Sequence, residues 1–284
     1  MIGLLQITNA YPHIHIVGSG PWAKKVTQVL EKSSLAFNIH RSDARHFIEN
    51  TGNINLDGSI IWLATRPTLQ LSILESLSKF PATILLDKPV VNDLESLNRL
   101  KELKLRSRSI FRMVQTWQCS QLWAISFSPL RELHSIQIER NYVESREYIS
   151  PNLDWLPHDF SLLLDMGLKP TDFSIDSLRL EGGKEFRLKA LLPLGVAIHL
   201  SISKGDKRKS KWKLFHKSGF VRTIDFEGRV SSLDDPDGRE IERWNQTVTE
   251  HPIEHVVTLI DAWGDSDFQN LLEYYQWYFE LGGI

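Results

Sequence analysis

The sequence has very little cysteine: Cys119 is the single one among 284 residues, so no disulfide can form within the chain. This suits a reducing compartment, and we expect a cytoplasmic protein. Apolar runs approaching the roughly 20 residues of a membrane-spanning helix are also lacking, so no membrane association is expected. The first residues lack the basic start of a secretion signal, and none is predicted.

An excess of charge of one sign is lacking too. Lysine and arginine number 33 against 35 acidic residues, a formal net charge of −2, which argues against a nucleic-acid partner. One basic cluster, at 204–213, lies between two strand-like runs and is typical of a solvated hairpin tip. The histidines are scattered without metal-ligand spacing beside a third ligand, so we predict no metal site.

What the chain does contain, over its first 115 or so residues, is short apolar runs that alternate with amphipathic segments. Such alternation predicts a parallel sheet with helices on both faces. The expected strands are 13–17, 35–40, 59–64, 83–86 and 110–114, and the expected helices are 21–32, 69–80 and 93–104.

The pattern then changes to successive strands with few helices between them. We expect a long strand at 133–143, a helix at 157–166, several strands over 177–226 and helices at 252–263 and 266–281. This order predicts a mostly antiparallel open sheet in a separate α+β domain. The fold class is therefore a doubly wound α/β domain of Rossmann type at 1–118, followed by an α+β domain at 119–284.

A glycine-rich turn follows the first expected strand and opens the first expected helix. Its residues fit the pattern G-x-G-x-x-[G/A], in which the glycines allow a tight turn and a close approach of a diphosphate to the helix N-terminus. The alternative is a strand–helix turn that binds nothing. The predicted cofactor-binding residues of this turn are Gly18, Ser19, Gly20, Pro21, Trp22 and Ala23.

The end of the second strand bears on which dinucleotide would bind. NAD-preferring domains usually place an acid about 20 residues past the glycines. Here Arg41 and Ser42 stand there, and no acid comes before Asp43. Because an arginine beside a serine suits a 2′-phosphate, we predict NADP(H) in preference to NAD(H). An exposed arginine at a strand end with no such role is the alternative.

Three further motifs complete a recognisable set: Ala64-Thr65-Arg66-Pro67, Asp87-Lys88-Pro89 and Asp154-Trp155-Leu156-Pro157-His158-Asp159. Together with the glycine turn, and in this order, they make the chain resemble the Gfo/Idh/MocA (glucose–fructose oxidoreductase/inositol dehydrogenase) family. The resemblance implies a Rossmann domain, an open-sheet domain that forms the substrate pocket, and a nicotinamide cofactor. It adds Ala64, Thr65, Arg66, Asp87 and Lys88 to the cofactor-binding residues. It also implies a cis Lys88–Pro89 peptide.

The resemblance further implies a catalytic trio of Lys88, Asp154 and His158. Hydride transfer from an alcohol needs a base for the proton and a positive group near the oxygen, which suits His158 and Lys88. Asp154 lies four residues before His158, so the two share a face if one helix includes both; a helix that starts at Pro157 leaves Asp154 just outside. Asp159 would face elsewhere, as a cap or an ion-pair partner.

The substrate would be a small polyhydroxylated molecule such as a sugar, a cyclitol or a nucleotide sugar. Trp117 and Trp155 are weak candidates for packing on its ring. By analogy with the family, we expect a homo-oligomer, a dimer or a tetramer.

Departures from the family pattern keep two other functions open. Gln70 stands near the place of a common histidine, and Pro157 and Ser161 interrupt a common pattern around His158. The alternatives are a cofactor-binding regulator or scaffold without turnover, and a reductase of imine or C=C bonds.

Overall fold

The computed structural model describes residues 13–33, 38–144, 149–182, 184–246, 253, 256–257 and 265–282. The chain divides into two compact units. One comprises Met1–Val91 with Asn98–Val114, and the other comprises Asn92–Leu97 with Gln115–Ile284. The domain boundary near residue 118 stays a prediction.

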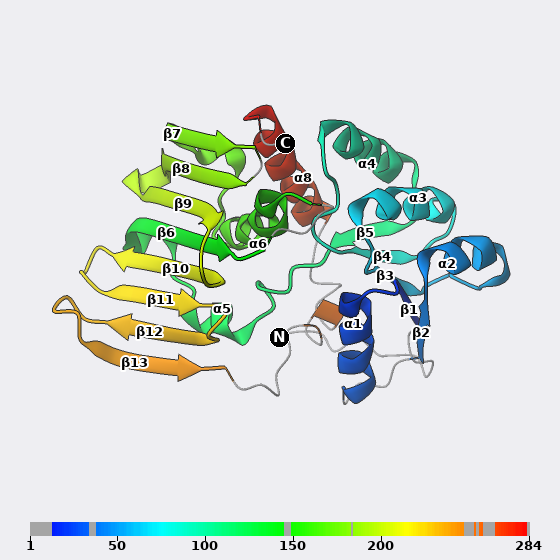
Figure 1. Ribbon diagram of the computed structural model, residues 1–284, viewed down its shortest axis with the longest axis horizontal. Coiled ribbons are helices and arrows are strands. Elements are labelled where there is room, and N and C mark those ends of the chain that lie inside the picture. Colours follow the sequence, from blue (N-terminus) through cyan, green and yellow to red (C-terminus); the bar gives the residue numbers. More distant parts are fainter. Residues whose placement is uncertain are drawn as a thin grey trace. The chain divides into compact units, whose positions relative to one another are not determined.

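The first unit is built on a five-stranded parallel sheet with the strand order β2-β1-β3-β4-β5 (Figure 1). Consecutive residues of β3 and β4 are buried, as expected of a sheet covered on both faces. The strands are β1 (His13–Val17), β2 (Asn38–Ser42), β3 (Ile60–Leu63), β4 (Thr83–Leu86) and β5 (Ile110–Met113). The helices are α1 (Pro21–Lys32), α2 (Ala44–Asn50), α3 (Pro67–Leu77) and α4 (Leu94–Arg106), the first turn of which belongs to the second unit.

The doubly wound fold predicted from the alternation is confirmed. The strands at 13–17 and 83–86 and the helix at 21–32 have the bounds that the sequence predicts. The second strand runs over Asn38–Ser42 rather than 35–40, and residues 34–37 lie outside the described part. Helix α2 was not predicted; at seven residues it is too short to show a clear helical period.

The second unit contains an eight-stranded sheet with the order β13-β12-β11-β10-β6-β9-β8-β7. Among the described strands of this sheet, only β6 and β9 pair in parallel, which confirms a mostly antiparallel sheet. The first strands are β6 (Leu133–Tyr142), β7 (Ser174–Glu181), β8 (Glu185–Leu191) and β9 (Ala197–Lys204). The others are β10 (Lys209–His216), β11 (Val221–Asp225), β12 (Val230–Asp234) and β13 (Glu240–Asn245).

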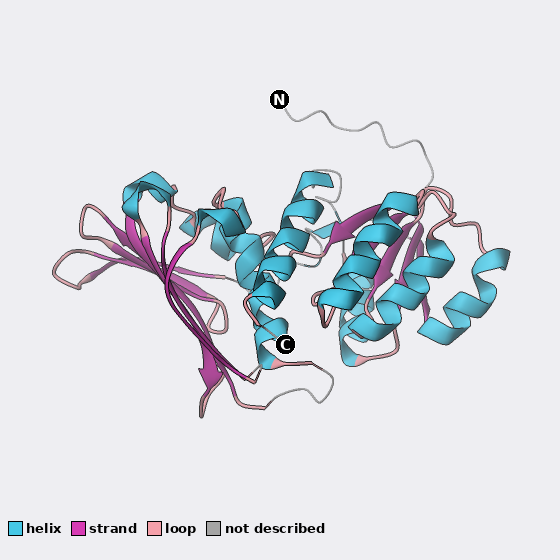
Figure 2. Cartoon of the chain, turned by 90° about the horizontal axis from the view of Figure 1, so that it is seen from above, coloured by secondary structure: helices cyan, strands magenta, loops and turns pink. Residues whose placement is uncertain are grey.

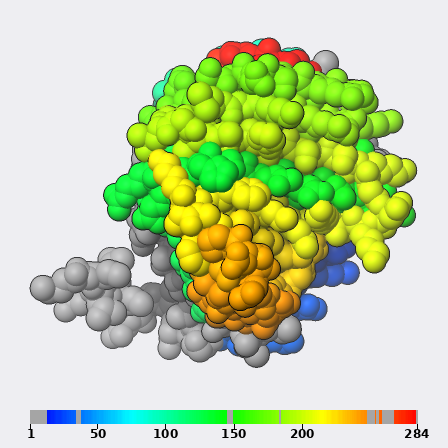
Figure 3. Space-filling view, turned by 90° about the vertical axis from the view of Figure 1, so that its left-hand side faces the viewer, coloured from blue at the N-terminus to red at the C-terminus, as the bar shows by residue number. Residues whose placement is uncertain are grey.

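One face of this sheet carries the helices α5 (Gln121–Ser126), α6 (Pro151–Asp165) and α8 (Asp265–Glu280) (Figure 2). Burial alternates along the strands: in β8, Phe186, Leu188 and Ala190 are buried while their neighbours are not. This period of two places every second side chain against the helices. Figure 3 looks onto the other face, whose surface is formed by the strands of the sheet.

The second unit corrects several expectations. Helix α6 begins at Pro151, not at Pro157, because Ser150 caps it by accepting a hydrogen bond from the Leu153 amide, and Pro157 lies inside the helix. Strands β12 and β13 extend the sheet beyond the predicted end at Phe226. The exposed edge strand β13 has no apolar alternation to indicate it. Most of the helix expected at 252–263 lies outside the described residues.

Candidate active site

The glycine turn of the first unit is fixed by its neighbours. A Cβ atom at Gly18 would lie 2.3 Å from the carbonyl oxygen of Ala64, so only glycine fits there. The Gly18 amide donates to the Ser42 carbonyl at 2.8 Å, and the Ala64 amide donates to the Val17 carbonyl at 2.9 Å. The turn is thus joined to the ends of β2 and β3. Three of the predicted cofactor-binding segments lie together here.

The second glycine has open space instead of a tight contact. No atom lies within 4 Å of a Cβ built on Gly20, which is the N-cap residue of α1. No side chain caps this helix, and its first turn contains no acidic residue. Uncapped amides at a helix N-terminus attract anions, so the turn has the electrostatics and the clearance that a diphosphate needs.

Trp22, in the glycine turn, contacts Asp87 of the Asp87-Lys88-Pro89 motif. Its indole Nε1 donates to Oδ2 of Asp87 at 2.7 Å, and the indole of Trp62 donates to Oδ1 at 3.1 Å. Asp87 is buried, and this desolvation raises its pKa to about 7, although the indole donors and Lys88 oppose the rise. Its carboxylate therefore joins α1, β3 and the end of β4.

Gln70 joins the two motif loops of the first unit through its side-chain amide. This amide donates to the carbonyls of Thr65 at 3.2 Å, Asp87 at 3.1 Å and Pro89 at 3.4 Å. Gln70 is completely buried. The structure also confirms that the Lys88–Pro89 peptide is cis. Sequence reasoning noted Gln70 only as a departure from the family and missed Trp62. A glutamine between two leucines was the available signal for Gln70, whereas Trp62 gave none because its strand is apolar throughout.

The residues expected to select the cofactor lie at the end of β2. Arg41 is exposed, and Ser42 accepts the amide of Gly18 through its carbonyl. The carboxylate of Asp43 caps α2 by accepting the amide of His46 at 2.9 Å, and this hydrogen bond lowers its pKa. The nearest acid is thus engaged in capping. Arg66, the N-cap residue of α3, is exposed.

In the second unit, α6 places both Asp154 and His158 within one helix, four residues apart and hence on one face. Both are partly buried. The His158 ring lies 6.2 Å from the ring of Trp117 and 6.4 Å from that of Trp155, measured between centroids. The structure therefore brings the predicted acid–base residue and both candidate aromatic residues together. Lys88 belongs to the other unit.

A buried ion pair beneath His158 fixes how α6 lies on the sheet. Arg140 of β6 and Asp159 are both completely buried, and Arg140 Nε lies 3.1 and 3.2 Å from the two carboxylate oxygens. The Trp212 indole donates to Asp159 at 2.8 Å. The expected pairing of Asp159 is thus confirmed, and its partner, Arg140, is a residue that sequence reasoning missed. Because Asp159 faces the sheet, the orientation of the adjacent His158 is set.

Trp155 serves mainly to pack this region. The guanidinium carbons of Arg140 and Arg208 lie 5.3 and 4.7 Å from its ring centroid, and only 4% of the residue is exposed. Trp117 packs edge-to-face on Phe226 at 4.6 Å and is more exposed. Of the two, Trp117 has the more surface to offer a substrate ring.

Among the residues that the structure describes, no group of three or more His, Cys, Asp or Glu side chains could hold a metal ion. None of the helices in these ranges is long and apolar enough to cross a membrane.

Solved structures with a similar architecture are known, at low sequence identity. No family model and no curated protein matches the sequence. A solved Gfo/Idh/MocA family oxidoreductase from Vibrio cholerae has a TM-score of 0.69 and 13% identity, over 93% of this chain and 95% of that one. A UDP-N-acetylglucosamine 3-dehydrogenase from Acidithiobacillus ferrooxidans gives 0.65 and 13%, over 93% and 95%.

A 3-ketoreductase from Actinomadura kijaniata, solved with TDP-benzene and NADP, gives a TM-score of 0.67 and 11% identity, over 93% of this chain and 94% of that one. These similar folds define a class of proteins in which a Rossmann-type unit is followed by an open-sheet unit. More particularly, the chain has the fold of Gfo/Idh/MocA oxidoreductases, as the motif resemblance predicts. At such identities the likeness is one of fold.

Proposed function

We propose that this protein is an NAD(P)-dependent oxidoreductase that transfers a hydride between the nicotinamide and a secondary alcohol or ketone. The observation that carries the proposal is the glycine turn. Gly18 can only be glycine, whereas the space around Gly20 is open and the helix amides behind it are uncapped. A turn that binds no ligand would still need glycine at position 18, but it would not need open space and uncapped amides at Gly20.

The residues present fit a dinucleotide. The backbone of the glycine turn would hold the diphosphate, and Thr65 and Lys88 end the neighbouring strands where doubly wound sheets bind ligands. Arg41 and Ser42 would receive a 2′-phosphate, so we propose NADP(H) over NAD(H). The capping role of Asp43 supports this choice, because a carboxylate that already accepts a helix amide is less available to ribose hydroxyls.

The chemical roles follow from the ionisable groups. The nicotinamide would supply or accept the hydride, while the protein manages the proton and the charge on oxygen. Lys88 would polarise the reacting oxygen, His158 would take or return the proton, and Asp154 would orient the imidazole. Arg140 and Asp159 act as positioning residues, since they hold α6 and hence His158.

The substrate class rests on the aromatic surroundings of His158 and on the similar folds. One of these is a UDP-N-acetylglucosamine 3-dehydrogenase, and another is a 3-ketoreductase solved with TDP-benzene. We propose a sugar, a cyclitol or a nucleotide sugar, with Trp117 against its ring. We further propose a cytoplasmic homo-oligomer; a sequence with a single cysteine, which cannot form an internal disulfide, is in keeping with that compartment.

The first test is a fluorescence titration of the purified chain with NADPH and NADH. We expect saturable binding of both, tighter for NADPH, and an Arg41→Ala variant that binds NADPH more weakly while its NADH affinity is unchanged. Binding of neither dinucleotide would contradict the proposal.

The second test addresses catalysis with a screen of polyol and nucleotide-sugar substrates. His158→Asn should lower turnover about 100-fold or more while NADPH binding survives. His134→Asn, an exposed histidine of β6, is the matched control and should leave turnover unchanged. NADPH binding without turnover on any such substrate would favour a regulator, and turnover on imines or C=C bonds alone would favour a reductase of those groups.

A further inference from the structure

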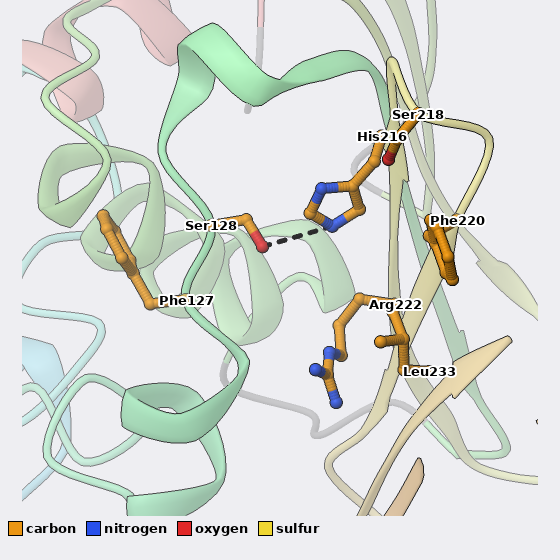
Figure 4. A pocket seen from close by; sticks show the side chains of 7 residues that line it. All are labelled: Phe127, Ser128, His216, Ser218, Phe220, Arg222 and Leu233. Carbon is orange, nitrogen blue, oxygen red and sulfur yellow. Dashed lines mark hydrogen bonds between the residues drawn. The ribbon is translucent and has the colours of Figure 1, made fainter. Parts of the chain in front are cut away.

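A cavity of about 270 Å³ lies within the second unit, between the loop after α5 and the strands β10 to β12. None of its lining residues belongs to the candidate active site. Figure 4 shows the side chains that line it. Its lining residues are Phe127, Ser128, His216, Ser218, Phe220, Arg222 and Leu233.

The loop side of the cavity is held in place by buried hydroxyl groups. Ser126, the last residue of α5, donates to the Ser231 hydroxyl of β12 at 2.7 Å. Two residues later, Ser128 lies with its Oγ 3.3 Å from Nε2 of His216, and the two side chains point toward each other (Figure 4). Ser128 is buried, so this hydroxyl has a fixed position at the cavity wall.

The imidazole of His216 is neutral near pH 7. Burial lowers its pKa below the ordinary value, and the charge of Arg222 lowers it further, although Glu132 opposes both. A neutral imidazole beside a hydroxyl offers hydrogen bonds without adding charge. The positive charge of the cavity lining therefore comes from Arg222.

Arg222 forms a two-pronged pair with Glu242 of β13, at 2.9 and 3.3 Å. The exposures of the two side chains differ sharply: 12% for Arg222 against 51% for Glu242. The guanidinium of Arg222 is thus largely buried, while the carboxylate of Glu242 is exposed to solvent. Arg222 therefore already binds a carboxylate in the planar, bidentate geometry that guanidinium groups favour.

We propose that this cavity is a binding site for a small ring-bearing carboxylate. Arg222 would bind the carboxylate, in competition with Glu242, and the hydroxyl of Ser128 would donate to it. Phe220 and Leu233 contribute the apolar part of the lining, against which a ring would pack, while the ring of Phe127 packs edge-to-face on Trp123. The volume of about 270 Å³ suits a ligand of roughly a dozen non-hydrogen atoms, such as a substituted benzoate.

The experiment uses the full chain and 4-fluorobenzoate, followed by ¹⁹F NMR titration, with 4-fluorobenzamide as a neutral probe of the same shape. We expect saturable binding of the acid and at least about tenfold weaker binding of the amide, because the amide lacks the charge that Arg222 recognises. Equal binding of the two probes, or binding of neither, would overturn the proposal.

Two variants with opposite expected effects assign the site. Arg222→Gln should weaken binding of the acid about tenfold or more, whereas Glu242→Gln should tighten it severalfold by removing the competing carboxylate. Arg243→Gln, which breaks an exposed pair with Glu240 on β13, is the matched control and should change nothing. Should Arg222→Gln fail to fold, Glu242→Gln decides: unchanged or weaker binding in that variant overturns the proposal.

Discussion

The indole Nε1 of Trp22 donates to the buried carboxylate of Asp87 across 2.7 Å, although 65 positions separate the two residues. One belongs to the glycine turn and the other to the Asp-Lys-Pro motif. The two sequence motifs expected to bind the cofactor are thus joined by a hydrogen bond within the first unit. Because Lys88 follows Asp87 directly, the position of the candidate catalytic lysine depends on this contact.

The stability of the protein should depend on pH through Asp87. Its folded-state pKa is about 7, above the ordinary 3.8, so between these values the folded chain holds a proton that the unfolded chain has lost. Stability then falls as pH rises through this window. Asp87→Asn cannot ionise, and its stability relative to the native chain should improve by about 2 kcal/mol from pH 5 to pH 8. Urea unfolding followed by tryptophan fluorescence measures this.

Asp43→Asn is the control for this titration. Hydrogen bonding lowers the pKa of Asp43, so this group is ionised in both states above pH 5. Its variant and the native chain should therefore show parallel pH dependence. If the unfolding free energy of Asp87→Asn has the same pH dependence as that of the native chain, Asp87 does not titrate as its burial implies.

The two glycines of the turn should respond differently to alanine. In Gly18→Ala the new methyl group meets the Ala64 carbonyl oxygen, so we expect a loss of about 2 kcal/mol or more in unfolding free energy. In Gly20→Ala the methyl group meets open space, so stability should hardly change while NADPH binding weakens about tenfold. Thermal unfolding and a dinucleotide titration separate the two effects. Undiminished NADPH affinity in a folded Gly20→Ala would count against the cofactor site.

Gln70→Leu should loosen the two motif loops. The change keeps the volume of the side chain but removes the amide that serves the carbonyls of Thr65, Asp87 and Pro89. Since buried carbonyls are costly to leave without donors, we expect a loss of about 2 kcal/mol in unfolding free energy, together with weaker NADPH binding. Gln137→Leu, at an exposed position of β6, is the control and should change neither quantity.

The ion pair beneath α6 should behave as a coupled unit. Arg140→Met or Asp159→Leu alone leaves a completely buried charge without its partner, and each should cost about 3 to 5 kcal/mol. The double variant should cost far less than the sum of the two, as a double-mutant cycle on urea unfolding would measure. Additive costs would mean that the two residues act independently. Breaking the exposed Arg179–Glu181 pair should have no measurable effect.

Local patterns predicted much of the framework. The strand 83–86 and the helix 21–32 have the expected bounds because each is a short run with a clear period and a turn signal beside it. Helix α6 was mispredicted at its start, since a proline favours the first turn of a helix and is unusual in its interior, where Pro157 lies. The strands β12 and β13 gave little signal because so few of their residues are buried.

The sequence by itself determined the order of most strands and helices and the glycine turn, because these depend on neighbours along the chain, whereas the structure decided that one helix includes both Asp154 and His158. Only the tertiary structure decided which side chains hold the motif loops and helix α6 in place. Trp22 with Asp87, Gln70 with three carbonyls, and Arg140 with Asp159 are contacts between residues 5 to 65 positions apart. The physical reason is that a buried polar group must find its partner in space, and that partner is set by how sheets and helices pack.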